Sequence, residues 1–138
     1  MRQTCQTLKK TGKAFSHVTT YHSLTELLTD RGLASLGDAY INFVYSLSLS
    51  NRKLKPLGRK VKGTVLAQAL KKAGLREYLP SRMDSHALAD GAEALLVYAW
   101  LQDCISLEES VAALERSDDA VEGLTQLLIA IRRKVKLF

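Results

Sequence analysis

Two stretches of this chain are apolar around nearly the whole circumference of a helix, and this feature constrains the fold most strongly. They run from Leu33 to Leu49 and from His86 to Cys104. A helix with apolar residues on every side is stable only when other elements surround it. No stretch shows the alternation of polar and apolar residues that is typical of a strand. The sequence therefore predicts an all-α helical bundle with these two segments as its central helices.

Shorter helices are expected around the two central ones, because capping residues precede amphipathic stretches. Asp84 or Ser85 is expected to cap the second central helix, and Gly74 suits the left-handed position after a helix end. The other expected elements are a short helix behind Ser23, a loop over 51–63, a helix over 64–73 capped by Thr64, and helices over 107–116 and 118–136.

The length of 138 residues suits one domain with one core. We expect a basic N-terminal arm over residues 1–22 and a helical domain over 23–138. Cys5 and Cys104 have neither zinc-ligand spacing nor the pattern of a disulfide framework, so two lone thiols in a reducing cytoplasm are expected. No apolar run approaches the roughly 18 residues of a membrane span, and no membrane association is expected.

Positive charge is concentrated in the middle of the chain. From Arg52 to Arg82 there are ten Lys or Arg residues and a single acid, Glu77, in a protein of net charge +6. A basic surface of this kind attracts phosphate polymers, which favours a nucleic-acid ligand. The alternative is that these residues form only a solvated helix face that keeps the protein soluble.

Three acids interrupt the two apolar segments: Asp38 in the first, and Asp90 and Glu93 in the second. The last two are three residues apart and share a helix face, with His86 one turn earlier. Burying a carboxylate needs a cation, a proton or contact with water, and a divalent ion such as Mg²⁺ suits carboxylate ligands. Alternatively, Asp38 is partly exposed and the other two acids bond to the basic loop. His86 is expected to pack or to support the ligands.

Two motifs resemble those of the ribonuclease III family. LASLGDAYINFVYSL, over residues 33–47, is similar to the family signature Leu-Gly-Asp-Ala on a leucine-rich helix. ALADGAEALLVYAWL, over residues 87–101, is similar to its second motif, Ala-Asp-x-x-Glu-Ala-Leu. The acids agree in type, spacing and order along the chain. The match extends over most of the segment from Leu24 to Cys104.

The resemblance implies a helical endonuclease domain that forms a homodimer and hydrolyses double-stranded RNA with Mg²⁺, for which Mn²⁺ can substitute. It assigns catalytic roles to Asp38 and Glu93, and metal binding to Asp38, Asp90 and Glu93. One position departs from the family pattern: Ala34 stands where the signature has a glutamate one turn before the aspartate. The alternative is therefore a degenerate member that binds structured RNA without cleaving it.

The chain is similar to the Mini-ribonuclease III branch of the family in having no separate double-stranded-RNA-binding domain. The helical domain itself is then expected to bind the duplex, by its shape and its phosphates. The candidate RNA-binding residues are Arg52, Lys53, Lys55, Arg59, Lys60, Lys62, Lys71 and Lys72.

Overall fold

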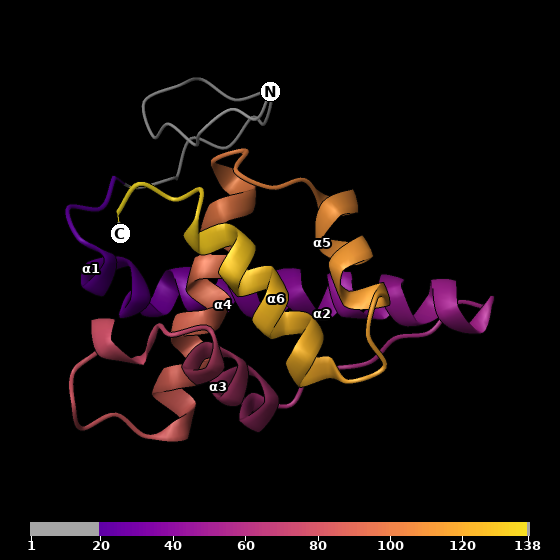
Figure 1. Ribbon diagram of the computed structural model, residues 1–138, viewed down its shortest axis with the longest axis horizontal. Coiled ribbons are helices and arrows are strands. Elements are labelled where there is room, and N and C mark those ends of the chain that lie inside the picture. Colours follow the sequence, from indigo (N-terminus) through magenta and orange to yellow (C-terminus); the bar gives the residue numbers. More distant parts are fainter. Residues whose placement is uncertain (1–19, 138) are drawn as a thin grey trace.

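The computed structural model describes residues 20–137, and helices are its only regular elements (Figure 1). No residue in this range lies in a strand. The predicted all-α fold class is therefore confirmed. The helices are α1 (Leu24–Leu28), α2 (Arg31–Lys53), α3 (Gly63–Lys72), the 3₁₀ helix η1 (Arg76–Tyr78), α4 (Ser85–Leu101), α5 (Leu107–Glu115) and α6 (Ala120–Arg132).

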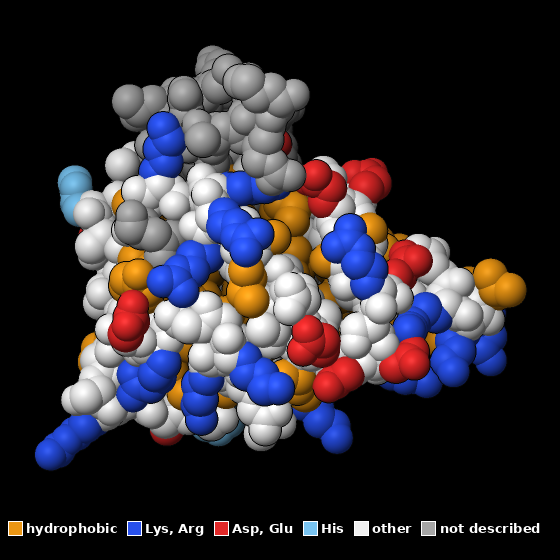
Figure 2. Space-filling view, in the orientation of Figure 1, with side chains coloured by type: hydrophobic (Ala, Val, Ile, Leu, Met, Phe, Trp, Pro, Cys, Tyr) orange, Lys and Arg blue, Asp and Glu red, His pale blue; other side chains and the backbone are white. Residues whose placement is uncertain are grey.

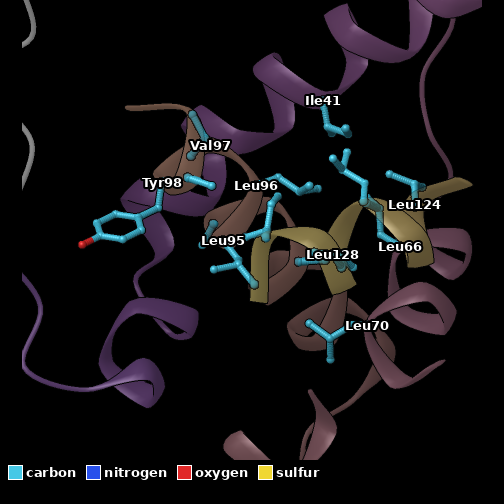
Figure 3. Close-up of a cluster of buried hydrophobic side chains, with 14 of the residues drawn as sticks. Ile41, Leu66, Leu70, Leu95, Leu96, Val97, Tyr98, Leu124 and Leu128 are labelled. Atoms are coloured by element: carbon cyan, nitrogen blue, oxygen red, sulfur yellow. The ribbon is translucent and has the colours of Figure 1, made fainter. Parts of the chain in front are cut away.

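The central helix is α4, as its unbroken apolar sequence predicted. It packs against α1, α2, α3 and α6 and runs through the middle of the fold in Figure 1. Every residue from Gly91 to Ala99 is buried. Each large apolar side chain buried in this way contributes about 1.5–3 kcal/mol relative to an exposed one. Figure 3 shows part of this core, with residues of α4 beside Ile41, Leu66, Leu70, Leu124 and Leu128.

By contrast, α2 lies at the side of the bundle, so the prediction that it is buried on every face is wrong. The face that includes Gly37 and Val44 packs against α4 and α5. Among the described residues nothing covers the opposite face, where Leu36 is 40% exposed and Phe43 is 54% exposed. The helix also continues through the first basic residues to Lys53, which leaves a shorter loop than predicted.

Polar caps define most helix starts. The predicted caps Ser23 and Asp84 are confirmed, because each side chain accepts a backbone N–H of the first turn. The prediction for Thr64 is wrong: α3 begins one residue earlier, with Lys62 at the N-cap and no side-chain hydrogen bond. Gly74 has a φ of 80°, which confirms the left-handed position after α3. Both C-terminal helices are present, and α6 is shorter at each end than predicted.

Asp30 fixes the start of α2. Its Oδ1 accepts the N–H of Leu33 at 3.1 Å, and its Oδ2 accepts the Tyr21 hydroxyl at 2.6 Å. The hydrogen bond from Tyr21, followed by that from the Leu33 amide, holds the pKa of the Asp30 carboxyl below its usual range. The ionised form of Asp30 therefore stabilises the helix that carries the first motif.

We predict that Asp30→Ala lowers the free energy of unfolding by about 1 kcal/mol, the usual effect of losing an N-cap. A depressed pKa also means that the contribution of Asp30 is present above about pH 4 and is lost as the pH falls through the folded-state value. Urea unfolding of both proteins at pH 7 and at pH 3 measures this. Equal stability of the two proteins at pH 7 would contradict the capping role.

Residues 1–19 and residue 138 lie outside the described part of the chain, so the predicted basic arm over 1–22 stays a prediction. Tyr21, near the end of that range, belongs to the core. Its side chain is 7% exposed, and its ring meets that of Tyr98 edge to face at 5.5 Å. Packing of this kind joins the start of the described chain to α4.

Cys104 is disulfide-bonded, so the prediction that it is a lone thiol is wrong. Cys5 lies outside the described residues. The lone thiols were the basis for expecting a reducing compartment, and that argument no longer holds. Within residues 20–137, no helix is long and apolar enough to cross a membrane.

Candidate active site

The two motif helices meet at one polar pocket. Four of its lining residues lie on one face of the first half of α2 and two lie on α4, and together they line an open pocket of about 420 Å³. The three predicted acids are all among them, which brings together the carboxylates of both motifs. The pocket is lined by Arg31, Ala34, Ser35, Asp38, Asp90 and Glu93.

Gly37 allows the two helices to come this close. A Cβ atom built on Gly37 would lie 2.0 Å from the backbone carbonyl oxygen of Glu93, a distance at which no side chain fits. The second motif glycine, Gly91, faces the carbonyl of Leu28 in α1 instead, at 3.4 Å from its ideal Cβ position. The glycine before Asp38 therefore sets the spacing between α2 and α4 at the acids.

Glu93 is the most buried of the three acids, with 7% of its surface exposed. Burial raises the pKa of its carboxyl to about 8; hydrogen bonding and negative charge from Asp38, and then the charge of Asp90, act in the same direction. The ammonium group of Lys60 opposes them and lowers this pKa. The local environment therefore favours either a proton or an added positive charge at Glu93.

Asp38 is partly buried and has one polar neighbour on its own helix. Asn42 Nδ2 donates to Asp38 Oδ1 at 3.1 Å, from one turn further along α2. Among residues 20–137, no three side chains of the His, Cys, Asp and Glu types converge closely enough to form a metal-binding group. The three acids line the pocket without meeting at one point.

The chemistry of the pocket nevertheless suits a hard divalent cation. Its three carboxylates are oxygen donors, the ligand type that Mg²⁺ prefers, and the burial of Glu93 disfavours an uncompensated negative charge there. His86 does not line the pocket and is exposed, so the prediction that it packs or supports the ligands is not borne out.

The candidate RNA-binding residues fall into three groups. The first is at the end of α2, the second in the segment that leads to α3, and the third in the last turn of α3, and all are exposed. Figure 2 shows Lys and Arg side chains gathered at the tip where α2 ends. Arg52 forms an ion pair with Asp118, so its charge is partly compensated. Lys60 is near enough to Glu93 for its charge to act there.

Two functional candidates were missed in the sequence. Arg31 lines the pocket from the first turn of α2, two turns before Asp38 on the same face. Its guanidinium has no hydrogen bond or ion pair within residues 20–137, so it is a free cation beside three acids. Asn42 was hidden in an apolar run, although its position four residues after Asp38 was a usable signal.

Comparison with known proteins agrees with this arrangement. The family model described as Ribonuclease III matches residues 31–135, which include both motif helices and all three acids. No individual curated protein matches the chain. The match covers most of the chain, and the chain therefore belongs to the ribonuclease III family, whose domain is an RNA endonuclease.

Proposed function

We propose that the protein is a metal-dependent endonuclease that hydrolyses phosphodiester bonds in double-stranded RNA. The observation that carries the proposal is the single pocket into which α2 and α4 bring Asp38, Asp90 and Glu93, with Glu93 buried. A protein that only binds RNA gains nothing from three acids facing a polyanion. Membership of the ribonuclease III family supports RNA endonuclease activity, and the lining of the pocket supports the choice of these three acids.

Asp38, Asp90 and Glu93 are the residues that would hold Mg²⁺ or Mn²⁺, which when bound lowers the pKa of a coordinated water and offsets charge on the reacting phosphate. The chain itself contributes position and charge. The contact of Gly37 with Glu93 fixes the two helices, and Asn42 orients the Asp38 carboxylate. Arg31 lines the pocket and the charge of Lys60 acts at Glu93, and this positive charge would attract the RNA backbone towards the acids.

Cleavage of a long RNA duplex tests the proposal. In Mg²⁺ the protein should cut both strands into short duplexes, whereas in EDTA the duplex should stay intact. Ca²⁺ is a useful third condition, because it binds oxygen ligands with different geometry. Cutting that is equally fast in EDTA would contradict a metal-dependent site.

A second function is favoured by one observation: Ala34 lines the pocket at the position where the family signature has an acid. With three acids instead of four, the site would hold a cation less strongly, and a protein that binds structured RNA without cleaving it would result. Restoring the acid distinguishes the two functions. The protein is a degenerate family member if the wild type binds duplex RNA without cutting it and the Ala34→Glu variant cuts it.

The basic segment before α3 is proposed to contact RNA phosphates. We predict that replacing Arg59, Lys60 and Lys62 together by Gln weakens duplex binding equally for unrelated sequences. The slope of log affinity against log salt should also become shallower by up to about 3, since each lost phosphate contact retains about one counterion. Fluorescence anisotropy at salt concentrations from about 50 to about 300 mM measures both the affinity and its dependence on salt.

The matched control removes the same charge elsewhere. Arg116, Arg133 and Lys136 are exposed and lie outside the proposed surface. Replacing these three by Gln should leave the salt slope close to that of the wild type. Equal salt slopes for the two triple variants would show that the segment before α3 does not hold the RNA contacts.

A homodimer is proposed through the uncovered face of α2. Leu36 and Phe43 are large apolar side chains, 40% and 54% exposed, and they flank Asp38 along the helix. Light scattering at micromolar concentration should give about twice the 15.3 kDa of one chain. Phe43→Glu should produce a monomer, because a carboxylate in an apolar interface is costly to desolvate.

Leu54→Glu is the control for the dimer prediction. Leu54 is also a large exposed apolar residue, at 90%, but it lies at the C-terminal end of α2, far along the helix from Asp38. This variant should remain a dimer. A monomeric wild-type protein would contradict a dimer interface on α2.

A further inference from the structure

The segment from Leu57 to Lys62, here called the basic strap, is fixed along α2 by three polar side chains. Ser50 Oγ accepts the N–H of Leu57 at 2.9 Å, and Ser46 Oγ accepts the N–H of Arg59 at 2.9 Å. Asn42 Oδ1 accepts the N–H of Val61 at 2.7 Å. The backbone of the strap is therefore bonded to α2 at every second residue.

The spacing of these bonds shows how the strap runs. Each step from Asn42 to Ser46 to Ser50 is four residues, about 6 Å along an α-helix. Each matching step in the strap is two residues, which in extended chain is about 6.6 Å. The two spacings agree, and the order is reversed. The strap is an extended segment that lies antiparallel to α2, with Val61 in register with Asn42.

The Asn42 side chain bonds both to the strap and to an acid of the candidate active site. While its Oδ1 accepts from Val61, its Nδ2 donates to Asp38 Oδ1 at 3.1 Å. A primary amide has a donor and an acceptor on one short side chain and can make both bonds at once. Ser46 holds the strap one turn further along and bonds to the backbone of Arg59, with no bond to an acid of the pocket.

We propose that Asn42 is a positioning residue that sets the basic strap in register with Asp38, so that RNA phosphates held by the strap lie at a fixed distance from the phosphate to be cut. The proposal rests on the function proposed above. Losing a bond that orients a reacting group reduces turnover, whereas losing a bond that orders a binding segment reduces affinity. Asn42 makes both kinds of bond and Ser46 only the second kind.

A pair of matched alanine variants separates these roles. Asn42→Ala removes the bonds to Val61 and Asp38, and should lower kcat at least tenfold on a short RNA duplex. Ser46→Ala removes only strap bonds, the two that Ser46 Oγ makes with the Arg59 backbone, and should raise KM severalfold with kcat within twofold of the wild type. If both variants cut with wild-type kcat and KM and differ only in melting temperature, the two side chains are merely structural and the proposal is wrong.

If the wild-type protein does not cut RNA, the proposed function is wrong, but the positioning role of Asn42 can still be tested by a second measurement. Amide hydrogen exchange should show faster exchange at Val61 in Asn42→Ala and at Arg59 in Ser46→Ala. Each variant should also bind duplex RNA more weakly than the wild type. Unchanged exchange at Val61 and unchanged affinity would overturn the positioning role of Asn42.

Discussion

Glu93→Gln should abolish cleavage of duplex RNA while leaving duplex binding intact. The substitution keeps the size of the side chain but removes the carboxyl group that could ionise and hold a cation at the most buried acid of the pocket. A bound divalent ion contributes several kcal/mol to the reaction, and about 1.4 kcal/mol corresponds to a tenfold change in rate. The rate should therefore fall by at least about 100-fold. Binding should survive, because the candidate RNA contacts are exposed cations on other segments.

The control for this prediction is Glu108→Gln, which makes the same chemical change at an exposed position in the first turn of α5. It should cut RNA at the wild-type rate. Equal cutting by wild type and Glu93→Gln would contradict the assigned site. A loss of both cutting and RNA binding in Glu93→Gln would instead indicate a folding defect, which circular dichroism detects.

Gly37→Ala should be the most destabilising single change at the site. Its new Cβ would lie 2.0 Å from the Glu93 carbonyl oxygen and 2.4 Å from the carbonyl carbon, both backbone atoms of a buried helix. The helices must separate, at a cost of about 3 kcal/mol or more for overpacking, against a gain of about 1 kcal/mol from helix propensity. The net loss of about 2 kcal/mol predicts a fall in melting temperature of roughly 8 °C.

Gly32→Ala is the matched control on the same helix. Its Cβ would meet Asp30 Oδ1 at 3.5 Å, an ordinary contact distance, so this variant should melt close to the wild type. The rate of RNA cleavage should fall in the same variant that loses stability. At a temperature where all three proteins are folded, Gly37→Ala should cut poorly because Asp38 has moved relative to Glu93. Wild-type stability of Gly37→Ala would show that α2 and α4 are not in close contact at this point.

The centre of the fold could be predicted from the sequence because α4 has no polar face. A helix that is apolar all round has only one stable location, the interior, and the helical propensities and caps agree with that location. The acids could be assigned to one site through the resemblance of the two motifs. Their meeting in one pocket follows from Gly37, whose role depends on a contact between segments far apart in the chain.

The exposure of α2 could not be predicted in this way. Its sequence has the same apolar appearance as α4, and only the arrangement of the other helices decides which of the two is enclosed. Arg31 was overlooked because it directly precedes the apolar run, and Ser46 and Ser50 because single serines in a helix usually have no tertiary role. The match between a four-residue helical step and a two-residue extended step becomes visible only when both segments are placed together.

The central proposal is that Asp38, Asp90 and Glu93 together form a divalent-cation site. Crystals of the wild-type protein soaked in Mn²⁺ test it directly, because manganese has an anomalous signal that protein atoms do not have. We predict an anomalous peak in the pocket between α2 and α4, held by its carboxylates directly or through water, that is absent in Glu93→Gln crystals treated in the same way. Well-diffracting crystals with manganese bound elsewhere, or with no peak in this pocket, would contradict the proposal.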